Sequence, residues 1–289
     1  MRSPLFVPGN RANMLEKAIG LAPDAYVPDM EDSVPPDEKA NARAVVASFL
    51  ERLAGTGTRV VPRVNSLDTG LLEDDLAAVV GPHIYGVSVG KIGSAEDVAN
   101  VSSVLDSLER KSGVEAGRVK LIPWIETAKG IVNAYGICAA SPRIVAVGFG
   151  AEDFTNDMGI PRLEDDSEVD YARRVVCVAA RAAEVLALDT PFFGFRDPEG
   201  LRESVRAARR YGFSGKFAIH PAQVDIINEG FSPSQDEIEH ARRVVAAFEE
   251  AERQGKGATS LDGQVIDVPV VRRARSLLDV AKAMKERDR

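Results

Sequence analysis

Short apolar runs alternate with helix-like segments along most of the chain, and this alternation constrains the fold more than any other feature. Each run is rich in β-branched residues and bounded by breakers, as buried strands are. The predicted strands are Leu5–Pro8, Ala25–Asp29, Val60–Val64, Gly86–Lys91, Val119–Ile125, Ile144–Val147, Pro191–Phe195 and Phe217–Ile219. The predicted helices are Asn10–Ile19, Asp37–Leu53, Leu71–Val79, Ala95–Glu109, Thr127–Ala139, Ser167–Leu186, Pro198–Tyr211 and Pro221–Glu229. This pattern favours an α/β protein of the (β/α)8 TIM barrel type, with a doubly wound parallel sheet as the alternative.

A tail follows the last of these units, so we expect a barrel domain at residues 1–230 and a C-terminal helical arm at residues 231–289. Ser234 is the predicted N-cap of a helix over Gln235–Gln254. A glycine-rich stretch from Gly255 to Ser260 is predicted to be flexible, and a last amphipathic helix begins near Val268. The arm is either a packing element for oligomer formation or a lid that carries a catalytic group.

Composition excludes several classes of protein. The chain has 289 residues, 45% of them hydrophobic and 28% charged, which is typical of a globular protein. The net charge of −8 argues against a general nucleic-acid binder. The sequence shows neither a signal peptide nor a membrane-spanning stretch, so a cytoplasmic location is expected. Cys138 and Cys177 lie in apolar helical runs and are predicted to be core thiols.

Glu126 and Asp153 occupy matching places, each where a predicted strand gives way to a helix. In α/β proteins ligands bind at that end of the strands. Two converging carboxylates without Cys or His suit a hard cation, which points to Mg²⁺, with Mn²⁺ as the alternative ion.

Further charged residues end the neighbouring strands. Arg63 is predicted to project into the barrel mouth, where its guanidinium could grip a substrate carboxylate or neutralise nearby acids. Asp29 and Glu31 share one face of their strand end and are expected to support the site, together with Lys91. Asp32 is interpreted as an acid in the first turn of the following helix.

The Gly148-Phe149-Gly150 turn lacks the third glycine and the later acid of a dinucleotide loop. Its N–H groups, from Gly150 through Ala151 and Glu152, open a short helix and could hold an anionic oxygen. His220 precedes a helix and is more typical of a structural hydrogen-bonding residue than of a base. With so few histidines, a His-rich metal site or a Ser-His-Asp triad is improbable.

Several motifs together resemble the citrate lyase β-subunit-like family. They are RSPLFVPGN, PDMEDSV, RVN, PWIETAKG, GFGAEDFTNDMG, SGKFAIHPAQ, FSPS and GKGATSLDGQVID, in order from residue 2 to the final helix. The family includes malyl-CoA and citramalyl-CoA lyases. The resemblance implies a Mg²⁺-dependent (β/α)8 enzyme in a homotrimer or a dimer of trimers.

The implied reaction is a Claisen-type cleavage of a 3-hydroxy-3-carboxyacyl-CoA into an acyl-CoA and a 2-oxo acid such as glyoxylate or pyruvate. The resemblance assigns the metal to Glu126 and Asp153, and the carboxylate of the oxo acid to Arg63. It assigns proton transfer to Asp267, which would reach a neighbouring subunit's site. It assigns CoA contacts to four residues, namely Phe6, Lys17, Ile219 and His220.

Two positions depart from the family pattern. Val89-Gly90-Lys91 replaces the usual Leu-Pro-Lys, and Asp29-Met30-Glu31-Asp32 replaces the usual Asp-Leu-Glu-Asp. The tail favours a free-standing lyase over the β subunit of a citrate lyase complex. The same barrel could also serve a CoA-independent 2-oxo acid aldolase, a thioesterase acting on malyl-CoA or a catalytically silent binding protein.

Overall fold

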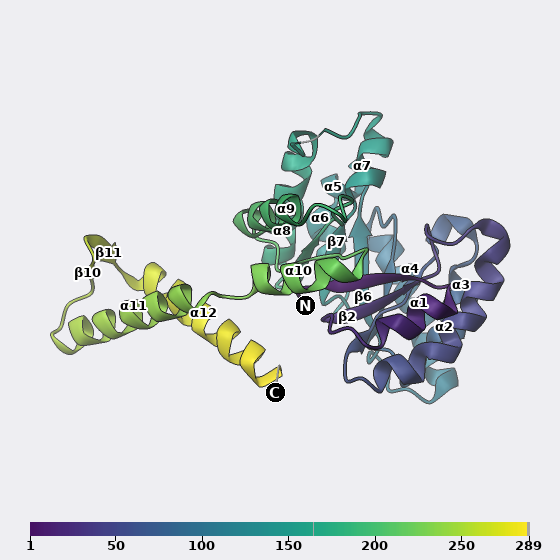
Figure 1. The fold of residues 1–289 in the computed structure, drawn as a ribbon, viewed down its shortest axis with the longest axis horizontal. Coiled ribbons are helices and arrows are strands. Elements are labelled where there is room, and N and C mark those ends of the chain that lie inside the picture. The colour runs from purple at the N-terminus through teal and green to yellow at the C-terminus, as the bar shows by residue number, and fades with distance from the viewer. Residues whose placement is uncertain (164, 288–289) are drawn as a thin grey trace. The chain divides into compact units, whose positions relative to one another are not determined.

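The computed structural model describes residues 1–163 and 165–287, and parallel strands form a nearly closed barrel within them (Figure 1). The strands are β1 Pro4–Pro8, β2 Ala25–Asp29, β3 Arg59–Val60, β4 Arg63–Val64, β5 Gly86–Val89, β6 Lys120–Ile125, β7 Ala146–Phe149, β8 Leu186–Asp189 and β9 Gly215–Lys216. Their order is β1-β2-β4-β5-β6-β7-β8-β9, and β3 pairs with β2. A parallel bridge between Leu5 and Ala218 brings the last strand back to the first. The predicted (β/α)8 fold is therefore confirmed.

Helices connect the strands. They are α1 Ala12–Ala18, α2 Lys39–Ala54, α3 Leu72–Val79, α4 Ala95–Ser112, α5 Ala128–Val132, α6 Ala134–Cys138, α7 Ala151–Met158, α8 Asp170–Ala182, α9 Pro198–Tyr211 and α10 Val224–Phe231. Short 3₁₀ turns precede several of them, at η1 Pro36–Glu38, η2 Leu67–Thr69, η3 Ser167–Val169 and η4 Pro221–Gln223. Because helices cover the outside of the barrel, the strands are buried on both faces, as a parallel sheet requires.

Aromatic side chains fill the barrel beneath its mouth. Trp124 on β6 lies 4.2 Å from Phe217, ring centre to ring centre, and Phe6 lies 5.2 Å from Phe217. A Cβ on Gly148 would lie 2.9 Å from the Trp124 ring, so glycine there makes room for the indole. These rings form an apolar floor below the polar residues that end the strands.

The predicted strand Pro191–Phe195 is wrong, because these residues form a loop and the strand of this unit is β8, Leu186–Asp189. The predicted helix Ser167–Leu186 is η3 followed by α8, which ends at Ala182. Long-range contacts explain why the strand of this unit is Leu186–Asp189. Buried Asp189 accepts hydrogen bonds from Lys216 and Arg173, so this run enters the core although it ends in an acid.

Smaller corrections have local causes. Pro62 has no N–H to donate, and the predicted strand Val60–Val64 is divided there into β3 and β4. The predicted helix Thr127–Ala139 is two helices, α5 and α6, which meet at Asn133. The predicted strand Phe217–Ile219 is displaced, since β9 is Gly215–Lys216.

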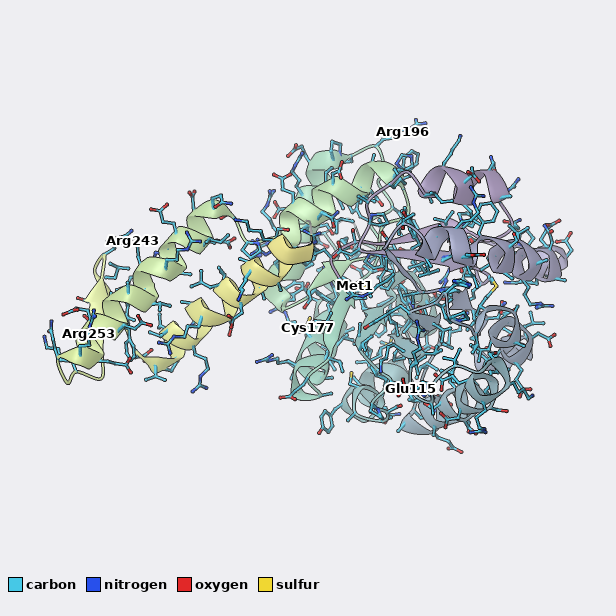
Figure 2. The ribbon with its side chains drawn as sticks, turned by 90° about the horizontal axis from the view of Figure 1, so that it is seen from below. Met1, Glu115, Cys177, Arg196, Arg243 and Arg253 are labelled. Atoms are coloured by element: carbon cyan, nitrogen blue, oxygen red, sulfur yellow. The ribbon has the colours of Figure 1, made fainter. Side chains whose placement is uncertain are left out.

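The chain divides into two compact units, Met1–Glu229 and Gly230–Arg289. The second unit consists of α11 Gln235–Arg253, β10 Thr259–Leu261, β11 Gln264–Ile266 and α12 Val268–Arg287. Ser234 accepts the Glu237 N–H and caps α11, as predicted. Part of the stretch expected to be flexible instead forms the β10–β11 hairpin. Arg243 on α11, labelled in Figure 2, pairs at 2.8 Å with Asp262 in the hairpin turn.

Cys138 and Cys177, the latter labelled in Figure 2, are free and buried, which confirms that they are core thiols. Burial raises the pKa of each to about 12, so neither is a ready nucleophile. Within the residues that the structure describes, no helix is long and apolar enough to cross a membrane.

Candidate active site

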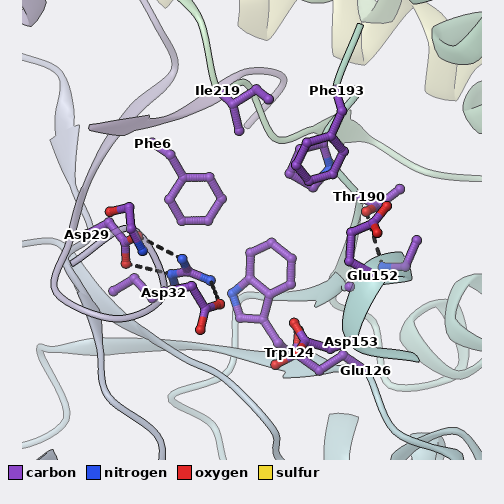
Figure 3. Close-up of a pocket in the computed structure, with 15 residues that line it drawn as sticks. Phe6, Asp29, Asp32, Trp124, Glu126, Glu152, Asp153, Thr190, Phe193 and Ile219 are labelled. Atoms are coloured by element: carbon purple, nitrogen blue, oxygen red, sulfur yellow. Dashed lines mark hydrogen bonds and ion pairs between the residues drawn. The ribbon is translucent and has the colours of Figure 1, made fainter. Parts of the chain in front are cut away.

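A cavity of about 460 Å³ opens at the carboxyl ends of the barrel strands (Figure 3). It is lined by Phe6, Asp29, Asp32, Ser33, Arg63, Trp124, Glu126, Gly150, Ala151, Glu152, Asp153, Thr190, Pro191, Phe193 and Ile219. Most of the residues that the sequence singled out therefore lie around one space. The aromatic floor gives this space an apolar base and a charged rim.

Arg63 is held firmly by the acids on one side of the cavity. Its Nε and Nη2 donate to the two carboxylate oxygens of Asp29, each at 2.7 Å. Its Nη1 lies 3.1 Å from Asp32 and 3.1 Å from Glu31. Burial is the largest single influence and would raise the pKa of Asp29, but the charge and hydrogen bonds of Arg63, with the Ser33 and Glu31 N–H groups, together lower it. Because Asp29 occupies one edge of the guanidinium fork, Nη1 is the edge turned toward other acids.

Lys91 contacts the acids of the site through both its backbone N–H and its charged side chain. Its φ of 55° lies in the left-handed region, which is unusual for a residue with a side chain. In this conformation its N–H donates to Glu126 Oε1 at 2.7 Å, and its Nζ lies 3.4 Å from Glu31 Oε1. Burial would lower the pKa of Lys91, but the charges of Glu31 and the neighbouring acids raise it. The amine therefore stays protonated, which disfavours a Schiff-base role.

Glu126 follows β6, Asp153 lies in the first turn of α7, and Figure 3 shows the two side chains close together. Burial, followed by the charges of Asp153 and Glu31, raises the pKa of Glu126 to about 8. Burial and the charge of Asp32 likewise raise the pKa of Asp153. Acids crowded in this way are stabilised as anions when a cation lies between them.

The donor set suits a magnesium-like ion. In residues 1–163 and 165–287, no cluster of three or more His, Cys, Asp or Glu side chains forms a complete metal cage. Two carboxylates facing an open cavity match an ion that keeps waters and takes substrate oxygens. A Cβ on Gly150 would lie 2.2 Å from Glu126 Oε2, so glycine at this position leaves the space that the carboxylate occupies.

Gly150 precedes α7 and places its first N–H groups at the cavity wall. The Ala151 N–H donates to Thr190 Oγ1 at 3.2 Å, which ties α7 to the residue that follows β8. Glu152 pairs with Arg162 at 2.9 Å, so its carboxylate is engaged away from Glu126 and Asp153.

A second cavity of about 330 Å³ shares Phe6 and Ile219 with the first. Lys17 and His220 line it together with the two shared residues, so the four positions assigned to CoA lie around one space. His220 Nδ1 accepts the Ala222 N–H at 3.2 Å, so the histidine also has the structural role favoured from the sequence.

The family profile HpcH/HpaI aldolase/citrate lyase matches residues 2–221. The chain belongs to this family. The resemblance inferred from the motifs is thereby confirmed, and the match covers the barrel strands that carry the polar residues described above.

Three relatives in this aldolase/citrate lyase family match nearly the whole chain. The citrate lyase subunit beta of Haemophilus influenzae is 38% identical, over 98% of this chain and 97% of the relative. The (3S)-malyl-CoA thioesterase of Cereibacter sphaeroides is 38% identical, over 98% and 95%. The mitochondrial citramalyl-CoA lyase of Rattus norvegicus is 33% identical, over 99% and 87%.

A solved structure of the family has the same fold. The protein CitE of Mycobacterium tuberculosis, in complex with magnesium, acetoacetate and coenzyme A, is 31% identical to this chain. The TM-score is 0.80, and the match covers 97% of this chain and 98% of CitE.

Asp267 lies in the second unit, where its Oδ1 accepts the Val270 N–H at 3.2 Å and caps α12. The interpretation of Asp32 as a first-turn acid is wrong, because the helical turn η1 begins only at Pro36; Asp32 instead lines the first cavity and pairs with Arg63. The sequence does not single out Thr190 or Phe193, because the strand that precedes them ends earlier than its pattern predicts.

Proposed function

We propose that this protein is a Mg²⁺-dependent carbon–carbon lyase that cleaves a 3-hydroxy-3-carboxyacyl-CoA, such as malyl-CoA or citramalyl-CoA. The products would be acetyl-CoA or a related acyl-CoA and a 2-oxo acid, glyoxylate or pyruvate. The observation that carries the proposal is the placement of Glu126 and Asp153 in one cavity with Arg63, above an apolar floor. Membership of a family that contains citrate and citramalyl-CoA lyases supports the reaction type.

Charge sets the roles of the residues. Glu126 and Asp153 would hold the cation, which when bound acts as a Lewis acid on the hydroxyl and carboxylate oxygens of the substrate. Asp29 holds one edge of the Arg63 guanidinium, so Arg63 would bind the substrate carboxylate through Nη1. There the substrate would compete with Asp32 and Glu31, which both lie 3.1 Å from Nη1. The Gly150 and Glu152 N–H groups at the start of α7 would hold a further anionic oxygen, while the Ala151 N–H is already engaged by Thr190.

In the proposed cleavage, one carbon–carbon bond breaks and two protons are transferred. The bond between C2 and C3 breaks, the C3 hydroxyl loses its proton and becomes the carbonyl of the oxo acid, and C2 keeps the electron pair. A carboxyl group must then protonate C2 to give the acyl-CoA. The family resemblance assigns this donor to Asp267 of a neighbouring copy in a homotrimer or a dimer of trimers.

The thioester carrier would extend from this cavity into the adjoining one. Phe6 and Ile219 line both cavities, and Lys17 and His220 line the second. This placement supports CoA as the carrier, because a thioester arm that leaves the first cavity past Phe6 enters the second cavity. Magnesium and CoA both appear in the CitE complex.

The test is product analysis with purified protein and Mg²⁺. Malyl-CoA and citramalyl-CoA are each supplied, and released CoA is separated from acetyl-CoA by chromatography. The proposal requires acetyl-CoA and the oxo acid in equal amounts. The malyl-CoA thioesterase in the family makes hydrolysis the second candidate, and free CoA with malate would favour it.

A further inference from the structure

The loop after β8 and the segment after β9 both line the cavities, yet the ladder between these strands ends below them. Asp189 pairs with Lys216 as the last register pair, and the Phe217 N–H to Asp189 carbonyl bond at 3.1 Å follows it. Beyond that point the loop carries Thr190, Pro191 and Phe193 into the first cavity. Phe193 and Phe195 are exposed, so burial does little to fix their positions.

One buried amide links the two segments above the end of the ladder. Gln223 ends the 3₁₀ turn η4 and is 2% exposed. Its Oε1 accepts the N–H groups of Ile219 at 2.9 Å and His220 at 3.3 Å. Its Nε2 donates to the Phe192 carbonyl at 2.7 Å. Both polar ends of this side chain are therefore used, one on each segment.

The residues on either side of this link face the substrate spaces. Ile219 lines both cavities, His220 lines the second, and Phe193 lines the first. The Phe195 ring also stacks on His220, with ring centres 5.2 Å apart and planes 28° apart. A shift of the loop would therefore move walls of both cavities together.

We propose that Gln223 is a positioning residue that fixes the loop after β8 against the end of β9 and so preorganises the CoA-binding side of the site. The inference rests on the proposed function, because it takes the second cavity to be the place of the CoA moiety. An ordered loop lowers the entropy that binding must otherwise remove. Loss of the link should therefore weaken CoA binding more than it slows the chemical step.

The test is direct titration of CoA itself, which needs no turnover. Gln223→Met keeps the approximate size of the side chain and removes its hydrogen bonds to both segments. We expect the dissociation constant for CoA to rise about tenfold, the loss expected from about 1.4 kcal/mol. With the thioester substrate, KM should rise in the same proportion while kcat changes less than about twofold. Backbone amides of residues 192–196 should exchange with deuterium faster than in the unaltered protein.

Val101→Ala is the matched control, because Val101 is fully buried on α4 and the change lowers stability without touching either segment. Its CoA affinity should stay unaltered at a comparable loss of thermal stability. If Gln223→Met does not fold, Gln223→Glu takes its place, since it keeps the acceptor for Ile219 and removes the donor to Phe192. Unchanged CoA affinity in the folded Gln223 variant, or an equal loss in Val101→Ala, overturns the inference and leaves the lyase proposal standing. Absence of CoA binding by the unaltered protein overturns both.

Discussion

The carboxylate of Asp29 grips the guanidinium of Arg63 through two hydrogen bonds of 2.7 Å, one to Nε and one to Nη2. This pair joins the end of β2 to the start of β4 and sets the direction of Nη1. The Arg63 guanidinium also lies over the Phe6 ring, with its carbon 4.6 Å from the ring centre. The planar fork, and not charge alone, therefore fixes this corner of the cavity.

Arg63→Lys should consequently impair the enzyme although it preserves the positive charge. An ammonium group cannot bind Asp29 through two parallel bonds and present a further donor at the same place. In the condensation direction, we expect KM for the 2-oxo acid to rise roughly tenfold or more, with KM for the acyl-CoA nearly unchanged. Unaltered KM values for both glyoxylate and pyruvate would identify Arg63 as a structural counter-ion to the acids.

Glu126→Gln and Asp153→Asn should each leave the fold intact and lower kcat/KM by ~10²-fold or more, because each removes one of the two proposed anionic metal ligands. Titration of Mg²⁺, or of Mn²⁺ as its spectroscopic substitute, should show weakened metal binding in both variants. Glu96→Gln, the same change at an exposed site on α4, serves as the control. Full activity after exhaustive chelation would rule out the metal.

Gly150 provides a second probe of the same site. At φ −106° alanine is allowed by the backbone, but its Cβ would lie 2.2 Å from Glu126 Oε2. Gly150→Ala should therefore displace the Glu126 carboxylate and reduce metal affinity as Glu126→Gln does. Gly136→Ala on α6, where a Cβ meets nothing within 4 Å, should retain both metal affinity and activity.

The stability of the barrel should fall in acid through Glu109. This buried carboxylate accepts bonds from Arg143 at 2.6 Å and from the Val119 N–H at 2.7 Å. Burial would raise its pKa, but these bonds lower it to about 2 from the ordinary value of 4.5. Because the folded pKa is the lower one, the stabilisation is complete above pH 4.5 and is lost as the pH falls toward 2.

The expected loss across this window is about 3 kcal/mol at most, measured by urea unfolding at a series of pH values. Glu109→Gln should be less stable than the unaltered protein at neutral pH and less sensitive to acid between pH 4.5 and 2. Equal acid sensitivity in the two proteins would assign the effect to other carboxylates.

At Asp267, asparagine is the substitution that separates the carboxyl group from the helix cap. Its Oδ1 caps α12, so replacement by alanine would remove a cap as well as the proposed proton donor. Asp267→Asn retains the cap and should still abolish cleavage if the carboxyl group donates the proton. Mixing it with Glu126→Gln should restore activity in about a quarter of sites if three copies form a ring and the donor acts in the neighbour. No recovery after proven subunit exchange would place Asp267 at its own barrel or outside catalysis.

The sequence alone predicted correctly those features of the fold and site that a local residue pattern determines. Glu126 and Asp153 could be placed because each follows an apolar run that ends at a breaker, and the cap at Ser234 follows from its own tetrapeptide with Glu237. For Arg63 the sequence left two roles open, binding a substrate carboxylate or neutralising nearby acids, and the pairing with Asp29 belongs to the second. Asp29 ends β2 and Arg63 begins β4, and the geometry of the fork depends on how the barrel brings these two strands together.

Prediction from the sequence failed where contacts between residues distant in the chain determine the structure. Asp189 enters the core because Lys216 and Arg173 neutralise it, and neither partner is near it in the chain. The aromatic run from Pro191 to Phe195 has strand-like composition but lies in the loop that Gln223 anchors. Thr190, the cavity residue between the two, could not be found without knowing where β8 ends.

Cleavage in D₂O with Mg²⁺ tests the central claim most directly. If C2 leaves the broken carbon–carbon bond with the electron pair and is then protonated, acetyl-CoA from malyl-CoA or citramalyl-CoA must carry one solvent deuterium in its methyl group. Mass spectrometry of the thioester product should show this singly labelled acetyl-CoA, in amounts equal to the oxo acid, and its loss with Glu126→Gln. Free CoA and the intact hydroxy acid as the products, with no acetyl-CoA at any time, would contradict the assignment as a carbon–carbon lyase.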